Sequence, residues 1–192
     1  MRTLSPGGRI TAAAVAAAIA VMCGCARPAV PEVVVIGATL PLSGPDAARG
    51  RAIARGYQRA ADEVSARGGV RLGAGDARVP LRIEVRDDGG QSVLAERYAD
   101  ELVGRGAVAL LATFGPVRAA TQAALAERVR RPFVVSKADA PGLPGRHAEW
   151  AVALPAEGDD EARAHAIASR LIEAIERAGV TDARAIRHAL TE

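Results

Sequence analysis

The sequence predicts an α/β fold, a doubly wound parallel sheet of about five strands in the order 2-1-3-4-5, with helices on both faces. Two observations support this prediction. Apolar runs rich in Val, typical of strands buried on both faces, alternate with segments whose apolar residues recur at helical spacing. Apolar residues form 49% of the chain and aromatic residues only 3%, so the core must consist mainly of aliphatic side chains.

Five segments are predicted to be strands, because each is a short apolar run bounded by turn-forming residues. In chain order they are 33–40, 79–85, 107–112, 133–136 and 150–154. Pro80 lies near the start of the second run and has no backbone N–H to donate. This strand is therefore expected at an edge of the sheet.

Five helices are predicted from apolar stripes and from recognisable ends. In chain order they are 51–66, 93–103, 116–129, 159–178 and 182–190. Gly68 and Gly179 suit helix C-termini, and Pro116 suits a first helical position. Thr181 or Asp182 is expected to cap the last helix.

Residues 1–25 are predicted to be an export signal with a lipid attachment site. Two arginines precede the apolar run 10–22, which is too short to span a bilayer as a stable helix. Cys25 follows a small residue, as the lipid-accepting Cys of a lipobox does, and cleavage nearby without a lipid is the alternative. Residues 26–32 contain two prolines and would form a tether. The protein is thus expected in the periplasm or at the cell surface, anchored to the membrane.

The charge pattern does not favour nucleic acid as a partner. The formal net charge is +3, but residues 1–25 hold two arginines and no acid. The remainder therefore has 23 basic and 22 acidic residues. Basic and acidic residues alternate there, whereas nucleic-acid-binding proteins usually gather their positive charge on one face.

The sequence contains no recognisable enzyme or cofactor motif. Neither a Gly-rich phosphate loop nor a G-x-S-x-G elbow follows a predicted strand. His147, His165 and His188 lack the spacing of zinc ligands. We therefore expect a non-catalytic protein with no metal site and no cofactor.

The loops that follow the first, third and fourth predicted strands are the candidate ligand site, because doubly wound sheets bind ligands beyond the carboxyl ends of their strands. Gly115 lets the backbone approach a ligand closely, and the helix after it presents N–H groups suited to a carboxylate. Arg118 could add a charged contact. The alternatives are a solvated Arg118 and a solvated pair of Lys137 and Asp139.

The motifs between Val34 and about Leu171 resemble the amino-terminal lobe of the branched-chain amino acid (leucine-type) solute-binding proteins of ABC transporters. Residues 37–44 (GATLPLSG) match the family pattern G-x-x-x-P-L-S-G. Residues 132–138 (PFVVSKA) are similar to its P-x-I-S-x-A-T pattern, and Gly115 and Pro116 match the Gly-Pro before its third helix. The resemblance implies one lobe of the type I periplasmic binding fold.

The resemblance also implies a ligand site for the carboxylate and amino groups of an amino acid-like molecule. Its residues in this chain would be Ser43, Gly44, Arg49, Gly115, Arg118, Ser136, Ala138 and Asp139. The chain departs from the family at two of these positions, because Arg118 replaces part of a Ser pair and Asp139 replaces a Thr.

Members of this family have a second lobe, which we expect this chain to lack. Residues 33–178 would form the one lobe, and residues 179–192 a helical segment similar to the family's carboxyl-terminal part. We expect a solute-binding lipoprotein that serves an ABC permease, in a reduced or truncated form. A second copy could replace the missing wall of the ligand site. The alternative is a protein-interaction or sensory lobe that no longer binds small molecules.

Overall fold

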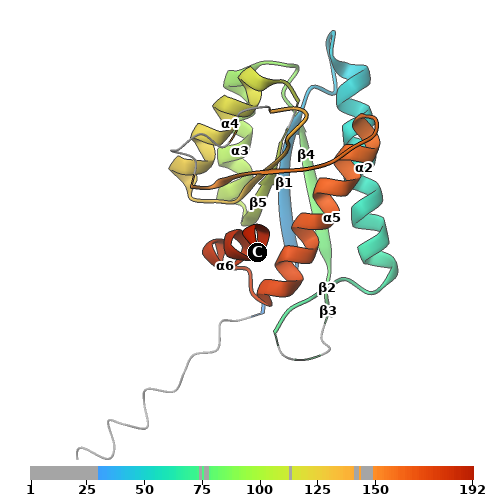
Figure 1. The fold of residues 1–192 in the computed structure, drawn as a ribbon, viewed down its shortest axis with the longest axis vertical. Helices are drawn as coiled ribbons and strands as arrows, with labels where there is room; N and C mark the ends of the chain where they lie inside the picture. Colours follow the sequence, from blue (N-terminus) through green and yellow to red (C-terminus); the bar gives the residue numbers. More distant parts are fainter. Residues whose placement is uncertain (1–29, 74, 76–77, 113, 141–142, 144–148) are drawn as a thin grey trace, which may run out of the picture.

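Five parallel strands form the central sheet of the computed structural model, in the spatial order β4-β1-β5-β6-β7 (Figure 1). Their bounds are β1 Val34–Leu40, β4 Leu81–Asp87, β5 Ala107–Leu111, β6 Phe133–Ser136 and β7 Ala151–Leu154. These are the five predicted strands, so the predicted order 2-1-3-4-5 is confirmed. The strand that follows Pro80 lies at an edge, also as predicted.

The structure describes residues 30–73, 75, 78–112, 114–140, 143 and 149–192. The predicted export signal, the lipid attachment site at Cys25 and the first part of the tether lie outside the described residues. Among the helices that are described, none has the length and apolar composition needed to cross a membrane.

Pro80 divides the predicted second strand in two. Arg78–Val79 form β3, which pairs antiparallel with β2 (Val70–Arg71), and the chain enters β4 only after the proline. The carbonyl of Pro80 still accepts a hydrogen bond from the N–H of Val34, at 2.8 Å. The small hairpin was not predicted, because two-residue strands leave almost no periodic signal.

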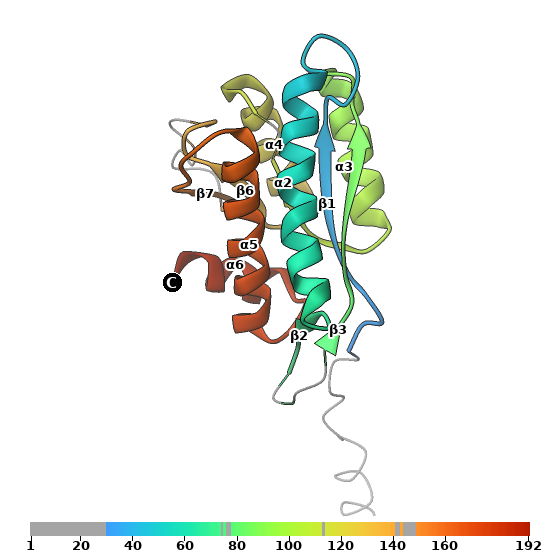
Figure 2. The same cartoon turned by 90° about the vertical axis from the view of Figure 1, so that its right-hand side faces the viewer.

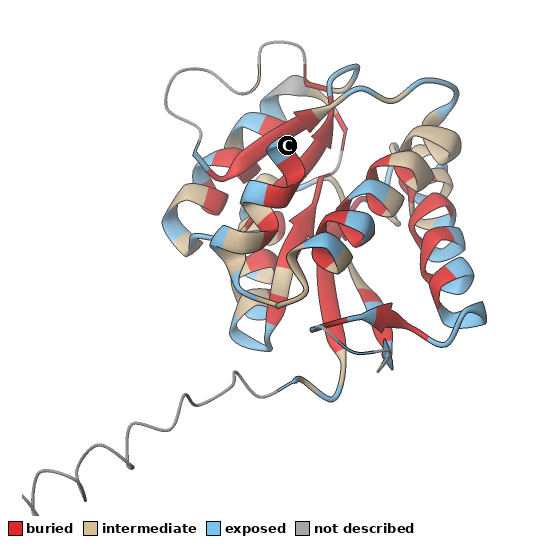
Figure 3. Cartoon of the chain, turned by 60° about the horizontal axis from the view of Figure 1, so that its bottom comes forward, coloured by how far each residue is buried: buried red, intermediate tan, exposed pale blue. Residues whose placement is uncertain are grey.

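Two pairs of helices cover the two faces of the sheet (Figure 2). Alternate strand residues pack against α2 (Ala47–Ala66) and α5 (Asp160–Ala178) on one face. The others pack against α3 (Ser92–Gly104) and α4 (Pro116–Val129). β1, β5, β6 and β7 are therefore almost wholly buried, as the red strands in Figure 3 show, whereas the edge strand β4 is partly exposed.

Several helix ends follow the predicted rules. Asp159 accepts a hydrogen bond from the N–H of Ala162 at 2.8 Å and caps α5. Gly179 ends α5 in the left-handed conformation, with φ of 65°. Asp182 caps α6 (Ala183–Thr191), which confirms one of the two candidates for that cap. Helix α2 differs from the prediction, because it begins at Ala47 and so includes Arg49 in its first turn.

Helix α6 belongs to the folded core. Ile186 is fully buried in the cluster formed with α2 and α5, and Ala183 packs against the cluster of the opposite face. The guanidinium of Arg177 on α5 donates to the carbonyl of Ala189 at 2.6 Å. Residues 179–192 therefore pack as part of the same α/β unit as the preceding residues.

Gly56 lies where α2 and α5 approach each other. A Cβ atom at this position would lie 2.3 Å from the carbonyl oxygen of Glu161 and 2.8 Å from the Cβ of Ala164. Both contacts are with parts of α5 that cannot move without shifting the helix. The absence of a side chain at Gly56 thus sets the distance between the two helices.

We predict that Gly56→Ala destabilises the fold by about 1–3 kcal/mol, the usual cost of overpacking. Gly104→Ala is the matched control, because Gly104 also lies in a helix but an added Cβ there meets nothing within 4 Å. The control should be neutral or more stable by up to about 1 kcal/mol. Urea unfolding checks both variants, and equal stability of Gly56→Ala and the parent would contradict the packing argument.

Candidate functional site

The predicted ligand residues gather at the end of the molecule where the strands finish and α2, α3, α4 and α5 begin (Figures 1 and 2). They are Ser43, Gly44, Arg49, Gly115, Arg118, Ser136, Ala138 and Asp139. The structure also brings to this end several polar and aromatic residues that the sequence analysis did not select. These are Asp46, Asp87, Asp88, Phe114, Asp160 and Arg163.

Asp87 joins the loop after β1 to the loop after β4. Its Oδ1 accepts hydrogen bonds from the backbone N–H groups of Leu42 at 2.9 Å, Ser43 at 3.2 Å and Gly89 at 2.9 Å. These bonds favour the ionised carboxylate, and with the Ser43 side chain they lower the pKa of Asp87, the Gly89 bond most. Asp87 therefore fixes the position of Leu42 and Ser43 in the loop after β1.

Asp88 lies directly below this loop and is 1% exposed. Its Oδ1 accepts a hydrogen bond from the N–H of Gly90 at 2.8 Å, and the side chain of Thr39 is a further partner of the carboxylate. Burial raises the pKa of Asp88, and the charge of Asp87 adds to that rise. The Gly90 bond, the charge of Arg118 and the Thr39 hydrogen bond offset part of it.

Arg118 extends from the first turn of α4 to Asp46, with 2.7 Å between its Nη2 and the carboxylate Oδ2. Its guanidinium carbon also lies 5.2 Å from the centroid of the Phe114 ring, and that of Arg49 lies 4.1 Å from the same centroid. Phe114 is buried, so cation–π contacts from two arginines hold it at the carboxyl end of β5. Arg118 is thus ordered by its neighbours and is not the solvated side chain of the alternative hypothesis.

Four charged side chains form a neutral network beside Arg118. Arg49 contacts Asp139 at 2.9 Å and Asp160 at 2.8 Å. Arg163 contacts Asp160 at 2.5 Å and Asp139 at 3.5 Å. The bond to Asp160 raises the pKa of Arg49 most. The partners of Asp139 are therefore arginines of α2 and α5 and not Lys137, and the network ties both helices to the loop after β6.

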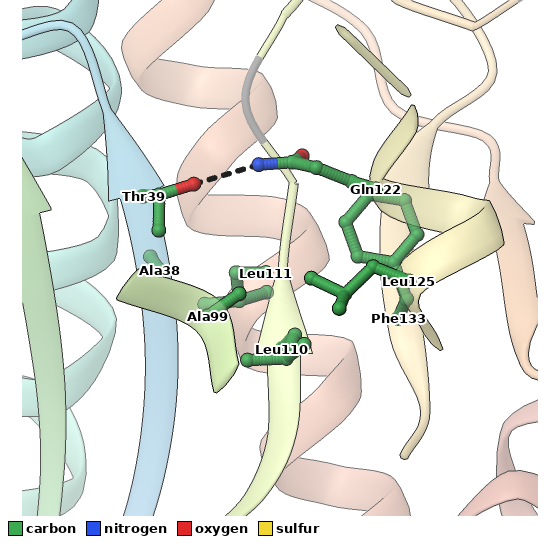
Figure 4. Close-up of a pocket in the computed structure, with 8 residues that line it drawn as sticks. All are labelled: Ala38, Thr39, Ala99, Leu110, Leu111, Gln122, Leu125 and Phe133. Carbon is green, nitrogen blue, oxygen red and sulfur yellow. Dashed lines mark hydrogen bonds between the residues drawn. The ribbon is translucent and has the colours of Figure 1, made fainter. Parts of the chain in front are cut away.

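A buried polar layer supports the site from below. The Nε2 of Gln122 on α4 donates to the Oγ1 of Thr39 on β1 at 2.7 Å, above a layer of apolar side chains (Figure 4). Tyr57 on α2 donates its hydroxyl proton to the carbonyl of Ala112 at the end of β5, and burial raises its pKa. Ser136 accepts the N–H of Ala138 at 3.2 Å. These bonds fix the strand ends from both faces of the sheet.

A small cavity separates the first turns of α3 and α4. Its volume is about 10 Å³, enough for one water-sized group. The residues that line it include Asp88, Gly90, Ser92, Arg118, Thr121 and Gln122. Val93 and Val117 stand next to Ser92 and Arg118 in the chain and are 76% and 75% exposed.

Comparisons with known proteins agree with the observed fold. A family model described as periplasmic binding protein matches residues 33–153. No curated protein matches the chain. A substrate-binding periplasmic protein from Ralstonia solanacearum has a similar structure, with a TM-score of 0.61 and 15% identity, over 83% of this chain and 89% of that one.

Two further solved structures each match over 64% of this chain with a TM-score of 0.51. One is an ABC transporter substrate-binding protein from Sphaerobacter thermophilus, 22% identical, of which 32% is covered. The other is the branched-chain amino acid transporter substrate binding protein LivJ from Streptococcus pneumoniae in complex with isoleucine, 21% identical, of which 33% is covered. The chain thus spans about a third of the length of these two proteins, and the likeness is one of fold.

We predict opposite effects of pH for Asp87→Asn and Asp88→Asn. The lowered pKa of Asp87 means that its ionised form stabilises the fold at neutral pH, and that this stabilisation is lost as pH falls below about 4. The raised pKa of Asp88 means that ionisation inside the fold costs free energy, and that this cost grows as pH rises above about 4.

At pH 7 we therefore expect Asp87→Asn to lower the free energy of unfolding by about 1 kcal/mol, the net value of a typical hydrogen bond. Asp88→Asn should raise it by an amount that grows between pH 3 and pH 7. Urea unfolding across this range checks both variants. Parallel pH profiles for the two variants would contradict the assignment.

Proposed function

Because the chain belongs to the periplasmic binding protein family, we propose that it is an exported, non-catalytic solute-binding component of an ABC-type uptake system. Its ligand would be an amino acid or a similar small carboxylate. Lipid attachment at Cys25, a tether over residues 26–32 and an ABC permease as partner complete the proposal.

The observation that carries the proposal is the first turn of α4. The chain enters this helix through Gly115 with φ of 90°, and Pro116 follows as the first helical residue. The first N–H groups of a helix have no acceptor within it and lie at the positive end of its dipole. Arg118 lies on this same turn, so the turn offers both backbone donors and a guanidinium to a carboxylate.

Asp46 now holds the position that a ligand carboxylate would take. It accepts from Arg118 at 2.7 Å while about half of its own side chain stays exposed. A ligand carboxylate would compete with Asp46 for the guanidinium, and the exposed Asp46 could then return to solvent at low cost. Arg49 and Asp139, by contrast, would serve mainly to hold the walls of the site through their network with Asp160 and Arg163.

The site lies at the end of the molecule opposite to the point where the described chain begins (Figure 1). A lobe tethered at its amino-terminal end would therefore direct the site away from the membrane. This arrangement is suitable for the capture of a solute from the surrounding medium.

One lobe supplies only one wall of a ligand site. If it kept half of a micromolar ligand's binding free energy of about −8 kcal/mol, about −4 kcal/mol would remain, which corresponds to millimolar affinity. A homodimer would add a second wall, since a partner copy could face the same ligand.

The alternative function is that of a protein-interaction or sensory lobe. It is favoured by the exposed side chains of Val93 and Val117 at the end that carries the site. It is also favoured by the neutralised arginines there, since both Arg49 and Arg118 already contact carboxylates of the chain itself.

We expect a thermal-shift screen of the purified protein against millimolar amino acids and small carboxylates to find a stabilising ligand. A ligand at 100 times its dissociation constant adds about 2.7 kcal/mol, which corresponds to a rise of roughly 5–10 °C in Tm for a chain of this size. Arg118→Ala should weaken that ligand at least tenfold.

Arg128→Ala is the matched control, because Arg128 lies on the same helix and forms a similar ion pair, with Asp100 at 2.9 Å, away from the site. It should bind the ligand as the parent does. A cooperative melt that no compound shifts would favour the interaction lobe instead.

A further inference from the structure

Three buried polar side chains form one hydrogen-bond network beneath the ligand site. Thr39, Asp88 and Gln122 are 2%, 1% and 4% exposed. The Nε2 of Gln122 donates to the Oγ1 of Thr39 at 2.7 Å (Figure 4), and the Thr39 side chain is also a hydrogen-bond partner of the Asp88 carboxylate. The Thr39 hydroxyl therefore accepts from one side chain and donates to the other. We call these three residues the Thr39 network.

The Thr39 network joins three parts of the fold that are distant in the sequence. Thr39 is the last but one residue of β1, Asp88 directly follows β4, and Gln122 lies in the second turn of α4. Hydrogen bonds away from water are strong, and a buried polar group that loses its partner is costly. The network therefore restrains the start of α4 and the loop after β4 relative to the end of β1.

Both ends of the Thr39 network reach Arg118. Gln122 follows Arg118 by four residues on α4, so the two side chains leave the same face of the helix. At the other end, Asp88 accepts the N–H of Gly90 at 2.8 Å, and a Cβ atom added to Gly90 would lie 3.1 Å from the Nη2 of Arg118. The network thus holds both the helical turn that carries Arg118 and the backbone that its guanidinium lies against.

The ion pair of Arg118 with Asp46 is a weaker restraint. About half of the Asp46 side chain is exposed, and ion pairs open to water contribute little to the order of a long side chain. The same pair must also open if a ligand carboxylate is to take the place of Asp46. An arginine that exchanges one carboxylate for another needs support from residues that stay in place, and the Thr39 network supplies that support.

We propose that Thr39 and Gln122 are positioning residues of the ligand site, which keep the guanidinium of Arg118 directed at the position of the ligand carboxylate. This inference rests on the proposed solute-binding function. Both residues are buried, so they act through Arg118 and not by contact with the ligand.

The test uses two substitutions of Thr39 that differ in one hydrogen-bonding group. Thr39→Val keeps the shape of the side chain and removes the hydroxyl, whereas Thr39→Ser keeps the hydroxyl. The order of Arg118 is measured by NMR relaxation of its side-chain Nε–H group, and calorimetry with leucine as the probe measures binding. Arg128 is the internal control, because it lies on the same helix and pairs with Asp100 at 2.9 Å away from the network.

A second pair of variants changes the support of Arg118 without touching the Thr39 network. Gly90 and Gly106 both have a left-handed backbone, with φ of 81° and 96°. An added Cβ at Gly90 meets the guanidinium of Arg118, whereas one at Gly106 meets nothing within 4 Å. Both alanine variants carry the same kind of backbone strain, so only Gly90→Ala should shift the Arg118 signal.

We expect Arg118 to be ordered in the parent and in Thr39→Ser, and mobile in Thr39→Val and Gln122→Met, with Arg128 unchanged in all four. Leucine should bind Thr39→Val about fivefold more weakly than the parent, the effect of one typical hydrogen bond. Thr39→Ser should bind it as the parent does. Urea unfolding confirms that each variant is folded under these conditions.

An Arg118 as ordered in Thr39→Val as in the parent, or one equally mobile in Thr39→Ser, overturns the positioning role and leaves the solute-binding function intact. An Arg118 signal unchanged in Gly90→Ala also overturns it, because the guanidinium would then not depend on that backbone. If Arg118 follows the expected pattern but the parent binds neither leucine nor any other amino acid or small carboxylate, the positioning of Arg118 is supported and the proposed function is overturned.

Discussion

The position of the site follows from one constraint of parallel sheets, which is that every strand ends and every following helix begins at the same edge. Unpaired helix N–H groups therefore converge with the strand-end loops, and this edge needs acceptors. The chain supplies them as aspartates. Asp159 caps α5. Asp87 accepts three N–H groups of the loops at this edge, and Asp88 accepts one. Acidic side chains at this end thus hold the strand-end loops and one helix start in place before they serve any ligand.

The arginines at the same edge form ion pairs with nearby acids and balance their charge. Arg49 and Arg163 balance Asp139 and Asp160, and Arg118 balances Asp46. Such pairs restrain the loops after β1 and β6 relative to α2, α4 and α5.

The sequence predicted correctly those helices and strands whose ends are marked by nearby residues such as Gly and Pro. The bounds of α4 and β6 agree residue for residue with the prediction, because Gly115, Pro116 and Pro132 mark their limits. The strand order was also predicted. The hairpin of β2 and β3 was not, since its strands have two residues each.

The partners of the charged side chains could not be predicted from local patterns. Arg49 meets Asp139 and Asp160 over separations of 90 and 111 residues, and Arg118 meets Asp46 over 72 residues. The buried state of Asp88 was missed for a related reason. Two neighbouring acids after a strand suggest a turn, and that local pattern does not reveal that the second acid is 1% exposed.

Helix α6 has a consequence for the behaviour of the protein in solution. β7 pairs with β6 along one side, and it forms an outer boundary of the sheet. The backbone groups of such a strand are a template on which a strand of another molecule can add, which leads to aggregates. α6 contacts β7 and its side chains pack in the cores on both faces of the sheet, so it lies beside this outer strand. Helix α6 is therefore expected to hinder the addition of a second molecule's strand to β7 and so to disfavour aggregation.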